Sequence, residues 1–437
     1  MNSDLKVLEC PFTWGVEKTL IKDLDNICIR LLERIEHIPL SNKATYFNVL
    51  AFVTHLEGKN ELALEYLHKA EDVLKDGQHD EADFIVTYSS FAWMHDHLGN
   101  QEDMALYLGK VKNIGQDAEV TVLGEKGWTF LRLGVNYYER AKESFQKAVE
   151  LKPESLSYNM GYGVVLYRIE ELVRRDKIHP ESSAAVKQLK KTLSLDPNLP
   201  EIMVLLALKL EGFEQEESRA LIEKALAQSP DVPQITRYAA KYFRAVGSIK
   251  ESLEVLSKAL DQAPNSSFLH HQVGLCYKQE YIRLSQSGRS NSDAVANCIR
   301  SLSKAVELKP SNTHAWVNMA EALSEDHQLD KAENIFTRLV RDKTLMEAEK
   351  QHCRTHYGLF LLYKRKDADG AVMQLKEAYK IKVPTYDRDK AGQKLRQLAG
   401  RRGCRNSREI LAFLDAEDEK SKNGDDLAKE FSKKMNL

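Results

Sequence analysis

The chain has 437 residues, 43% of them hydrophobic, so it can bury one large core or many small stacked cores. Its formal net charge is -2, so nucleic-acid binding would need local segregation of charge rather than an overall basic character. Six scattered cysteines without a Cys-x-x-Cys pair disfavour a disulfide framework and suit reduced thiols in the cytosol.

The N-terminal segment has no basic start followed by a long apolar run, so no secretory signal is predicted. No stretch approaches the ~20 apolar residues that a membrane span needs. We therefore expect a cytoplasmic, mostly helical protein with no membrane partner. Residues 1–45 are interpreted as two short N-terminal helices, interrupted by Pro11, Gly15 and Pro39.

One phrase then occurs four times: Lys-Ala, four residues, and Pro. The copies begin at Lys147, Lys224, Lys258 and Lys304, and the second and third are 34 residues apart, the period of tetratricopeptide-type helix-turn-helix repeats. The alanine lets two helices approach closely, and the proline ends the second helix because it lacks an N–H and clashes with the preceding turn. The phrase predicts an all-α fold, a superhelical solenoid in which neighbouring helix pairs must stack to bury their apolar faces.

The predicted solenoid takes up residues 46–387. Its helix pairs are placed at about 46–77, 84–118, 121–153, 155–197, 201–230, 234–264, 268–310, 314–345 and 351–383. Two repeats exceed the period, because Pro153 and Pro197 are 44 residues apart and Pro264 and Pro310 are 46 apart. Both surpluses contain polar runs without apolar periodicity, so extended helices joined by loops are expected.

Residues 388–437 form the third predicted segment, a basic stretch followed by diverged C-terminal helices. Between Arg388 and Arg408, eight basic residues stand against one acid, Asp389. Acidic residues then dominate, and one last helix is expected at about 425–435. This order explains how a near-neutral protein can still hold a positive patch.

No enzymatic constellation is recognisable in the sequence. It contains no Gly-x-Gly-x-x-Gly after a strand, no Gly-Lys-Ser/Thr phosphate loop and no Gly-x-Ser-x-Gly elbow. His352 and His356 lie one helical turn apart, a spacing that can hold a metal ion, but the sequence places no third ligand. We therefore expect partly buried repeat histidines there, with no catalytic residue, no metal and no cofactor.

Cationic and aromatic side chains recur on the first helices of the pairs, which line the concave face of a helical solenoid. The candidates are Arg132, Arg168, Arg237, Arg244, Lys309, Tyr138, Tyr238, Phe243, His271 and Gln272. Arginine donates two hydrogen bonds to one phosphate, and aromatic rings stack on unpaired bases. Each residue alone is more typical of a solvated rim or a packed core, whereas the recurring set favours a single-stranded nucleic acid.

Several longer phrases are more specific than the repeat. They are LECPFTW at 8–14, NVLAFV at 48–53, NYYERAK at 136–142, LLALKL at 205–210, RYAAK at 237–241 and LHHQVGLCYK at 269–278. Generic tetratricopeptide proteins do not share them. By these phrases the chain resembles the family of interferon-induced proteins with tetratricopeptide repeats, the IFIT family, from about Leu8 to Lys394.

The resemblance implies a cytosolic antiviral protein of innate immunity that binds RNA and has no catalytic activity. Members of the family hold the 5′ end of single-stranded foreign RNA in a positively charged channel. They favour a 5′-triphosphate or an incompletely methylated cap. Related family members and translation factors are the implied protein partners.

The resemblance also implies site residues. The residues matched to the 5′-phosphate site are Arg30, Arg34, Arg132, Tyr138 and Arg168. Those matched to the RNA path are Arg237, Tyr238, His271, Gln272, Lys309, Lys390 and Lys394. Trp128 matches an aromatic residue that stacks on the cap base in cap-binding relatives.

Two departures from the family pattern affect the predicted site. Arg34 stands where relatives often carry glutamine, which adds charge and could alter the preference for one 5′ end. Glu201 stands where relatives can place an aromatic residue, so one contact to a base is put in doubt. The eroded repeat around 415–419 likewise puts closure of the channel at that end in doubt.

A tetratricopeptide scaffold that grips a partner helix or peptide, without RNA, is the alternative to an RNA 5′-end binder. A third hypothesis, an enzyme, is remote. The first two differ in charge, because an RNA channel concentrates Arg and Lys inside and a peptide groove mixes apolar and polar sites. Arg132, Arg168, Arg237 and Lys309 on one interior face would favour RNA.

Overall fold

The computed structural model describes residues 5, 8–21, 24–37, 42–77, 79–114, 118–173, 178–383, 385–401 and 406–419. These ranges contain helices, turns and loops and no strand. None of the helices within them has both the length and the apolar character needed to cross a membrane. The chain divides into two compact units: unit 1 comprises 1–171 and 177–235, and unit 2 comprises 172–176 and 236–437.

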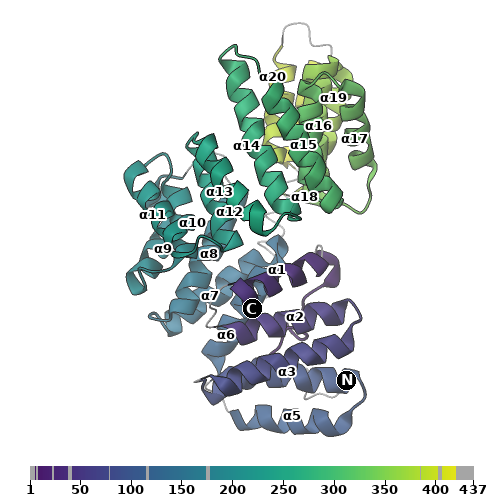
Figure 1. Cartoon of the computed structure of the whole chain (residues 1–437). Coiled ribbons are helices and arrows are strands. Elements are labelled where there is room, and N and C mark those ends of the chain that lie inside the picture. Colours follow the sequence, from purple (N-terminus) through teal and green to yellow (C-terminus); the bar gives the residue numbers. More distant parts are fainter. Residues whose placement is uncertain are drawn as a thin grey trace. The chain divides into compact units, whose positions relative to one another are not determined.

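Unit 1 opens with the 3-10 turn η2 and the helix α1 and continues as helix pairs (Figure 1). Its helices are α1 (Leu24–His37), α2 (Lys43–Leu56), α3 (Asn60–Asp76), α4 (Ile85–His97), α5 (Gln101–Ile114), α6 (Glu119–Leu133), α7 (Tyr138–Leu151), α8 (Leu156–Val173), α9 (Ala184–Leu195), α10 (Pro200–Leu210) and α11 (Gln215–Gln228). The 3-10 turns are η2 (Lys18–Leu20), η3 (Glu81–Phe84), η4 (Val135–Tyr137) and η5 (Pro180–Ser182).

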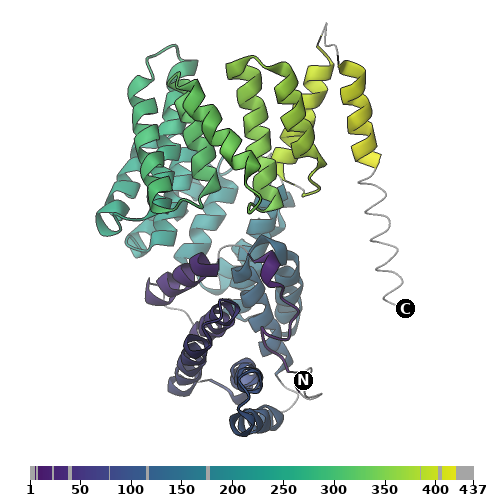
Figure 2. The ribbon, with the colours of Figure 1, turned by 90° about the vertical axis from the view of Figure 1, so that its right-hand side faces the viewer.

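Unit 2 continues the same helix-turn-helix pattern (Figure 2). Its helices are α12 (Pro233–Ala245), which begins at the unit boundary, α13 (Ile249–Gln262), α14 (Ser267–Gln286), α15 (Ser292–Leu308), α16 (Thr313–Glu325), α17 (Leu329–Arg341), α18 (Glu347–Phe360), α19 (Ala368–Lys380) and α20 (Tyr386–Ala399). A π-helical turn, η6 (Leu361–Arg365), extends α18, and residues 407–419 are also helical.

Small residues let the helices of each unit pack closely. Of the four alanines in the repeated phrase, Ala148, Ala225 and Ala305 are fully buried. Gly127 of α6 and Gly161 of α8 lie against the ring of Phe145 on α7, where an added methyl carbon would come within 2.7 Å and 2.3 Å of ring atoms. First helices of successive pairs are also in contact: α2 contacts α4, and α16 contacts α18. This is the stacking that a solenoid requires.

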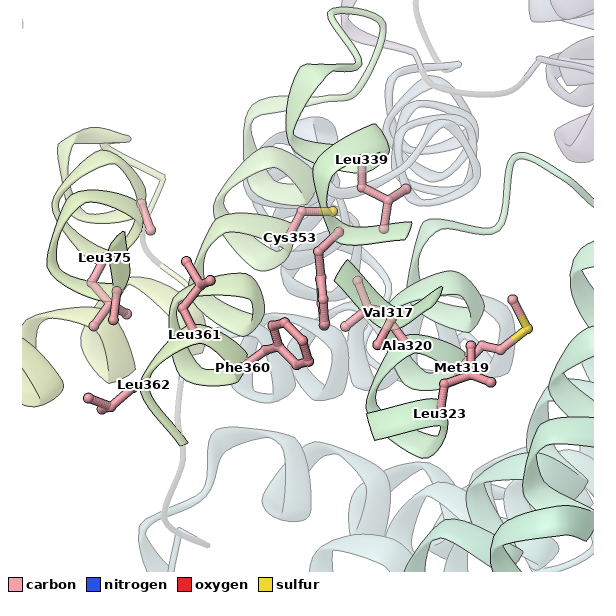
Figure 3. Close-up of a cluster of buried hydrophobic side chains, with 14 of the residues drawn as sticks. Val317, Met319, Ala320, Leu323, Leu339, Cys353, Phe360, Leu361, Leu362 and Leu375 are labelled. Atoms are coloured by element: carbon pink, nitrogen blue, oxygen red, sulfur yellow. The ribbon is translucent and has the colours of Figure 1, made fainter. Parts of the chain in front are cut away.

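The core of unit 2 runs continuously through its last pairs. Figure 3 shows Phe360 of α18 pointing toward Val317 and Ala320 of α16. Ile410 and Leu414 of the helix at 407–419 are buried in the same core. The helical stack therefore extends beyond the predicted end of the solenoid at residue 387, because apolar positions at helical spacing lie among the basic residues.

The predicted helix pairs agree with the observed ones to within a few residues. The long repeat at 268–310 is explained by α14 and α15, which have 20 and 17 residues. The surplus at 174–177 and the helix expected at 425–435 lie outside the described residues.

In the described part of the N-terminal segment, the structure has the 3-10 turn η2 and the α-helix α1. Ring packing also holds the chain around Phe12, before η2. Phe12 stacks on Trp93 with ring centroids 4.5 Å apart and meets Phe52 edge-on at 5.3 Å. Side chains of α2 and α4 therefore fix the course of this segment.

Candidate nucleic-acid interface

Three arginines from three helices of unit 1 gather near one buried carboxylate. Arg34 comes from α1, Arg132 from α6 and Arg168 from α8, and Glu201 lies in the first turn of α10. Tyr46 of α2 lies between the first two arginines and accepts a hydrogen bond from each. We call these five residues the arginine cluster.

Arg34 is buried, and each of its three guanidinium nitrogens donates a hydrogen bond within the protein. Its Nη2 lies 2.6 Å from Glu201 Oε2, and its Nε lies 3.2 Å from the Tyr46 hydroxyl. Its Nη1 donates to Gln234, whose own Nε2 donates to Glu201 Oε1 at 2.6 Å. The two departures seen in the sequence, Arg34 and Glu201, are thus partners in one buried ion pair.

Arg132 is also buried and lies between two aromatic rings. Its guanidinium carbon is 5.1 Å from the ring centroid of Tyr46 and 5.0 Å from that of Trp128, and its Nη2 is 2.5 Å from the Tyr46 hydroxyl. Its Nε has no hydrogen-bond partner among the described residues. Burial, with the neighbouring Arg34 adding to it, lowers the pKa of Arg132 to about 10. The side chain remains charged at neutral pH but is costly to bury without an anion.

Trp128 is only 2% exposed. Its indole Nε1 donates to Ser157 Oγ at 3.1 Å, and its ring meets Phe145 edge-on at 5.3 Å. Because Arg132 lies over this ring, a cap base could stack on it only after the guanidinium moved aside. The cap-stacking role of Trp128 stays a prediction.

Arg168 and Tyr138, both predicted for the phosphate site, lie in contact with each other. Arg168 Nη1 donates to the Tyr138 hydroxyl at 2.8 Å, and its guanidinium carbon is 5.7 Å from the ring centroid. Arg168 lies on α8 and is half-buried, and Tyr138 is the first residue of α7. Arg30, the fifth predicted residue of this site, is exposed one turn before Arg34 on α1.

The charges of the cluster act mainly on Glu201. Burial works against ionisation of this carboxylate, but the charges of Arg34, Arg132 and Arg168 and the hydrogen bond from Arg34 together outweigh burial. Together they hold the pKa of Glu201 below its usual value. The cluster therefore contains one anion of its own, Glu201, which pairs with Arg34. The guanidinium groups of Arg132 and Arg168, from α6 and α8, lie near the same carboxylate.

The predicted RNA-path residues all fall in unit 2. Arg237 of α12 lies between aromatic rings, with its guanidinium carbon 4.9 Å from the centroids of both Tyr238 and Phe268. This arrangement leaves a planar cation stacked on rings, which suits contact with bases or phosphates.

His271 and Gln272 of α14 are both buried. Gln272 accepts a hydrogen bond from Arg244 at 3.1 Å, and His271 lies 3.1 Å from the side-chain nitrogen of Asn318. Burial, then the charge of Arg244, lowers the pKa of His271 to about 4. His271 is therefore a neutral hydrogen-bonding group at neutral pH and adds no positive charge.

The predicted lysines lie further along unit 2. Lys309 follows the last residue of α15 and is half-buried. Lys390 and Lys394 of α20 line an open depression of about 440 Å³ together with Tyr386, Gln393 and Gln397. Their ammonium groups lie 5.5 Å and 5.3 Å from the ring centroids of Tyr386 and Tyr363.

The structure therefore brings together the predicted residues of unit 1 except the exposed Arg30, and distributes those of unit 2 over α12, α14, α15 and α20. It also adds Tyr46 and Gln234, which the sequence did not single out. Arg34 and Gln234 are 200 positions apart, so no local pattern could have connected them.

The chain is similar over most of its length to several curated proteins. The human antiviral innate immune response effector IFIT1 is 34% identical over 425 residues, which cover 92% of this chain and 88% of that protein. Human interferon-induced protein with tetratricopeptide repeats 2 is 32% identical over 452 residues, covering 98% and 94%. No protein-family model matches the chain.

Solved structures similar to this one include RNA complexes. The human IFIT1 dimer with m7Gppp-AAAA superposes with a TM-score of 0.77 and 31% identity, covering 99% of this chain and 98% of that one. The human IFIT1 dimer with PPP-AAAA gives a TM-score of 0.76 and 31% identity over the same shares.

Proposed function

The chain belongs to the family of interferon-induced proteins with tetratricopeptide repeats, and we propose that it is an antiviral RNA-binding protein that captures the 5′ end of single-stranded foreign RNA. The relatives with solved structures hold RNA that begins with a methylated cap or a triphosphate. The proposed ligands of this chain are the same two kinds of 5′ end, and its proposed action is binding rather than catalysis.

The single observation that carries the proposal is the arginine cluster of unit 1. Arg132 lies buried near two other guanidinium groups, and its lowered pKa reflects chiefly the cost of burying its charge, to which Arg34 and Arg168 add. A 5′-phosphate group brought to Arg132 and Arg168 would offset this cost. Guanidinium groups suit such a ligand because each can donate two hydrogen bonds to one phosphate.

The roles proposed within the cluster differ from one arginine to the next. Arg168, with Tyr138 beside it, grips the phosphates. Arg132 supplies a second charge from inside. Arg34 acts chiefly through its charge and by positioning Tyr46, because Glu201 and Gln234 already accept hydrogen bonds from its terminal nitrogens.

Glu201 should reduce the attraction for the most highly charged 5′ ends. Its carboxylate is held ionised inside the cluster and repels a phosphate that approaches the same arginines. We infer that this chain discriminates less strongly between triphosphate and less charged ends than it would with a neutral residue at this position.

Beyond the 5′ end, the proposed path of the strand includes Arg237, Tyr238, His271, Gln272, Lys309, Lys390 and Lys394. Sequence preference along this path should be weak, because contacts to phosphates fix the position of a strand without reading its bases. The proposed compartment is the cytoplasm. Association with family members is proposed because similar IFIT1 structures are dimers, and binding to translation factors stays a prediction.

The proposal is tested with one single-stranded RNA prepared with a 5′-triphosphate, a cap or a 5′-hydroxyl and titrated against the full chain at fixed salt. We expect the triphosphate or capped RNA to bind more tightly than the hydroxyl RNA. Equal and strongly salt-dependent binding of all three would indicate a general basic surface. Binding of none would favour the peptide-binding scaffold.

A further inference from the structure

Unit 2 contains a cluster of histidines and carboxylates that the proposed RNA site does not use. His352 and His356 lie one turn apart on α18, and Asp387 is the second residue of α20. One potential ligand atom from each of these three lies within 4.8 Å of those of the other two. The third ligand that the sequence could not place is thus supplied by the next helix but one.

The three side chains face one another and are largely enclosed. His352 Nδ1 lies 2.8 Å from Asp387 Oδ2, and His356 Nε2 lies 3.4 Å from Asp387 Oδ1. The side chains of His352, His356 and Asp387 are 14%, 12% and 13% exposed. The cluster is therefore largely screened from bulk water.

The hydrogen-bonding capacity of the cluster is not met by the protein. Among the described residues, His352 Nε2 and Asp387 Oδ1 are buried without a hydrogen-bond partner. Buried polar atoms without a partner are uncommon in native structures, and a bound ion would satisfy these two atoms. Both atoms are potential ligand atoms of the groups that form the cluster.

A second carboxylate orients one of the histidines from outside. Glu321 of α16 accepts a hydrogen bond from His356 Nδ1 at 2.6 Å, which directs the other ring nitrogen toward Asp387. Histidines that bind metals usually donate their second N–H to a carboxylate in this way, which fixes the tautomer. His314 of α16 brings a further imidazole beside His352, with ring centroids 4.3 Å apart.

We propose that His352, His356 and Asp387 form a binding site for one divalent first-row transition-metal ion, with Zn²⁺ as the representative ion. Two imidazoles and one carboxylate are ligands typical of such ions, whereas Mg²⁺ and Ca²⁺ prefer oxygen ligands throughout. Three protein ligands leave a fourth position open for water or for another side chain. Ligand atoms around a tetrahedral Zn²⁺ are about 3.4 Å apart, so small side-chain rotations bring the three atoms into place.

The three ligands come from two helices of unit 2, His352 and His356 from α18 and Asp387 from α20. A metal bound here would link α18 to α20 inside unit 2.

None of the three ligands is a proposed RNA-binding residue, although Asp387 shares α20 with Lys390 and Lys394 of the proposed RNA path. The alternative occupant is no ion at all, in which case the cluster is a hydrogen-bonded network that only joins the helices. Metal binding and RNA binding can therefore fail separately, and the experiment distinguishes the two cases.

The test is isothermal titration of the metal-stripped full chain with Zn²⁺ and, separately, with Mg²⁺. Five proteins are compared: the wild type, His352→Ala, Asp387→Asn, Glu321→Gln and the control His327→Asn. His327 is an exposed histidine of the same unit with a left-handed backbone, which asparagine tolerates. Circular dichroism verifies that each variant is folded.

We expect the wild type and His327→Asn to bind one more equivalent of Zn²⁺ than His352→Ala and Asp387→Asn do, with no Mg²⁺ bound at this site. Loss of the orienting carboxylate in Glu321→Gln should weaken Zn²⁺ binding by about 10- to 100-fold. The same Zn²⁺ isotherm in His352→Ala and Asp387→Asn as in the wild type would overturn the proposal. So would the absence of any Zn²⁺ binding, or Mg²⁺ binding as strong as that of Zn²⁺.

Discussion

Units 1 and 2 are built from the same repeat but differ in the basic groups that surround one largely buried carboxylate in each unit. In unit 1, Glu201 is held ionised by arginines, whose charge is permanent at physiological pH. In unit 2, Asp387 is held ionised by contacts with the imidazoles of His352 and His356, and an imidazole can be neutral at physiological pH. Permanent cations suit a phosphate ligand, whereas imidazoles that can become neutral suit a metal ion. The same kind of helix repeat thus provides one site suited to an anion and another suited to a metal cation.

Removing the internal anion of unit 1 should have the largest effect. Glu201→Gln leaves Arg34 buried without its carboxylate, so we expect the free energy of unfolding to fall by about 3 kcal/mol. The same change removes a negative charge from the phosphate site, so triphosphate RNA should bind more tightly. Urea denaturation and RNA titration check the two effects. Loss of stability together with weaker RNA binding would contradict the role assigned to Glu201.

Removing a buried cation should have the reverse effect on binding. Arg132→Met keeps the length of the side chain but removes a charge that burial disfavours, so stability should stay unchanged or increase. Triphosphate RNA should lose about 1.5–3 kcal/mol of binding, or roughly 10- to 150-fold in affinity. Fluorescence anisotropy of a labelled RNA measures the loss. Unchanged affinity would remove Arg132 from the site.

Glu125, a second carboxylate of unit 1, extends the comparison to a carboxylate without a cationic partner among the described residues. No Lys, Arg or His in the described part of the chain donates a hydrogen bond to it. Glu125 of α6 accepts hydrogen bonds from Thr45 and Asn48, and burial raises its pKa from 4.5 to about 7. Glu321 of unit 2, beside Lys278 and His356, has a pKa well below its usual range.

Between pH 4.5 and 7 the folded protein holds a proton on Glu125 that the unfolded chain has released, so this group makes stability fall as pH rises. Glu125→Gln should remove that fall. Relative to wild type, the variant should gain about 1 to 2 kcal/mol of stability on going from pH 5 to pH 8. Denaturation curves at both pH values measure the difference, and parallel behaviour of the two proteins would refute the assignment.

The smallest effect is expected at His271 of unit 2. Because its pKa is lowered to about 4, the side chain contributes a neutral hydrogen bond to the proposed RNA path. His271→Gln should weaken RNA binding by less than about tenfold and leave the salt dependence of binding unchanged. A reduced salt dependence would mean that His271 is charged in the complex, which would remove the contrast with Arg132.

The sequence predicted what depends on local spacing. The Lys-Ala-to-Pro phrase and its 34-residue period predicted the helix pairs, because helix ends and close helix packing are determined within one repeat. The spacing of His352 and His356 likewise placed two imidazoles on one face of α18. Neither pattern contains information about which distant helix supplies the partner.

The partners at long range could not be predicted for that reason. Arg34 and Glu201 are 167 positions apart, and each was noticed only as a separate departure from the family pattern. Because the two side chains form an ion pair, the positive charge that Arg34 adds to the site is balanced by the negative charge of Glu201. The protonation of His271 and Glu125 was equally inaccessible, because it depends on burial, which only the packed structure determines.

The central claim is that the arginine cluster recognises the 5′-phosphates, and a comparison of Arg168→Ala with the wild type tests it most directly. Each protein is titrated at one salt concentration with two RNAs that differ only in a 5′-triphosphate or a 5′-hydroxyl, with Arg219→Ala as the matched control. Arg219 is an exposed arginine of the same unit, bonded to Glu223, so this control loses the same formal charge outside the cluster. We expect the wild type and Arg219→Ala to prefer the triphosphate and Arg168→Ala to lose most of that preference while remaining folded. An equal preference in Arg168→Ala and the wild type would contradict the account.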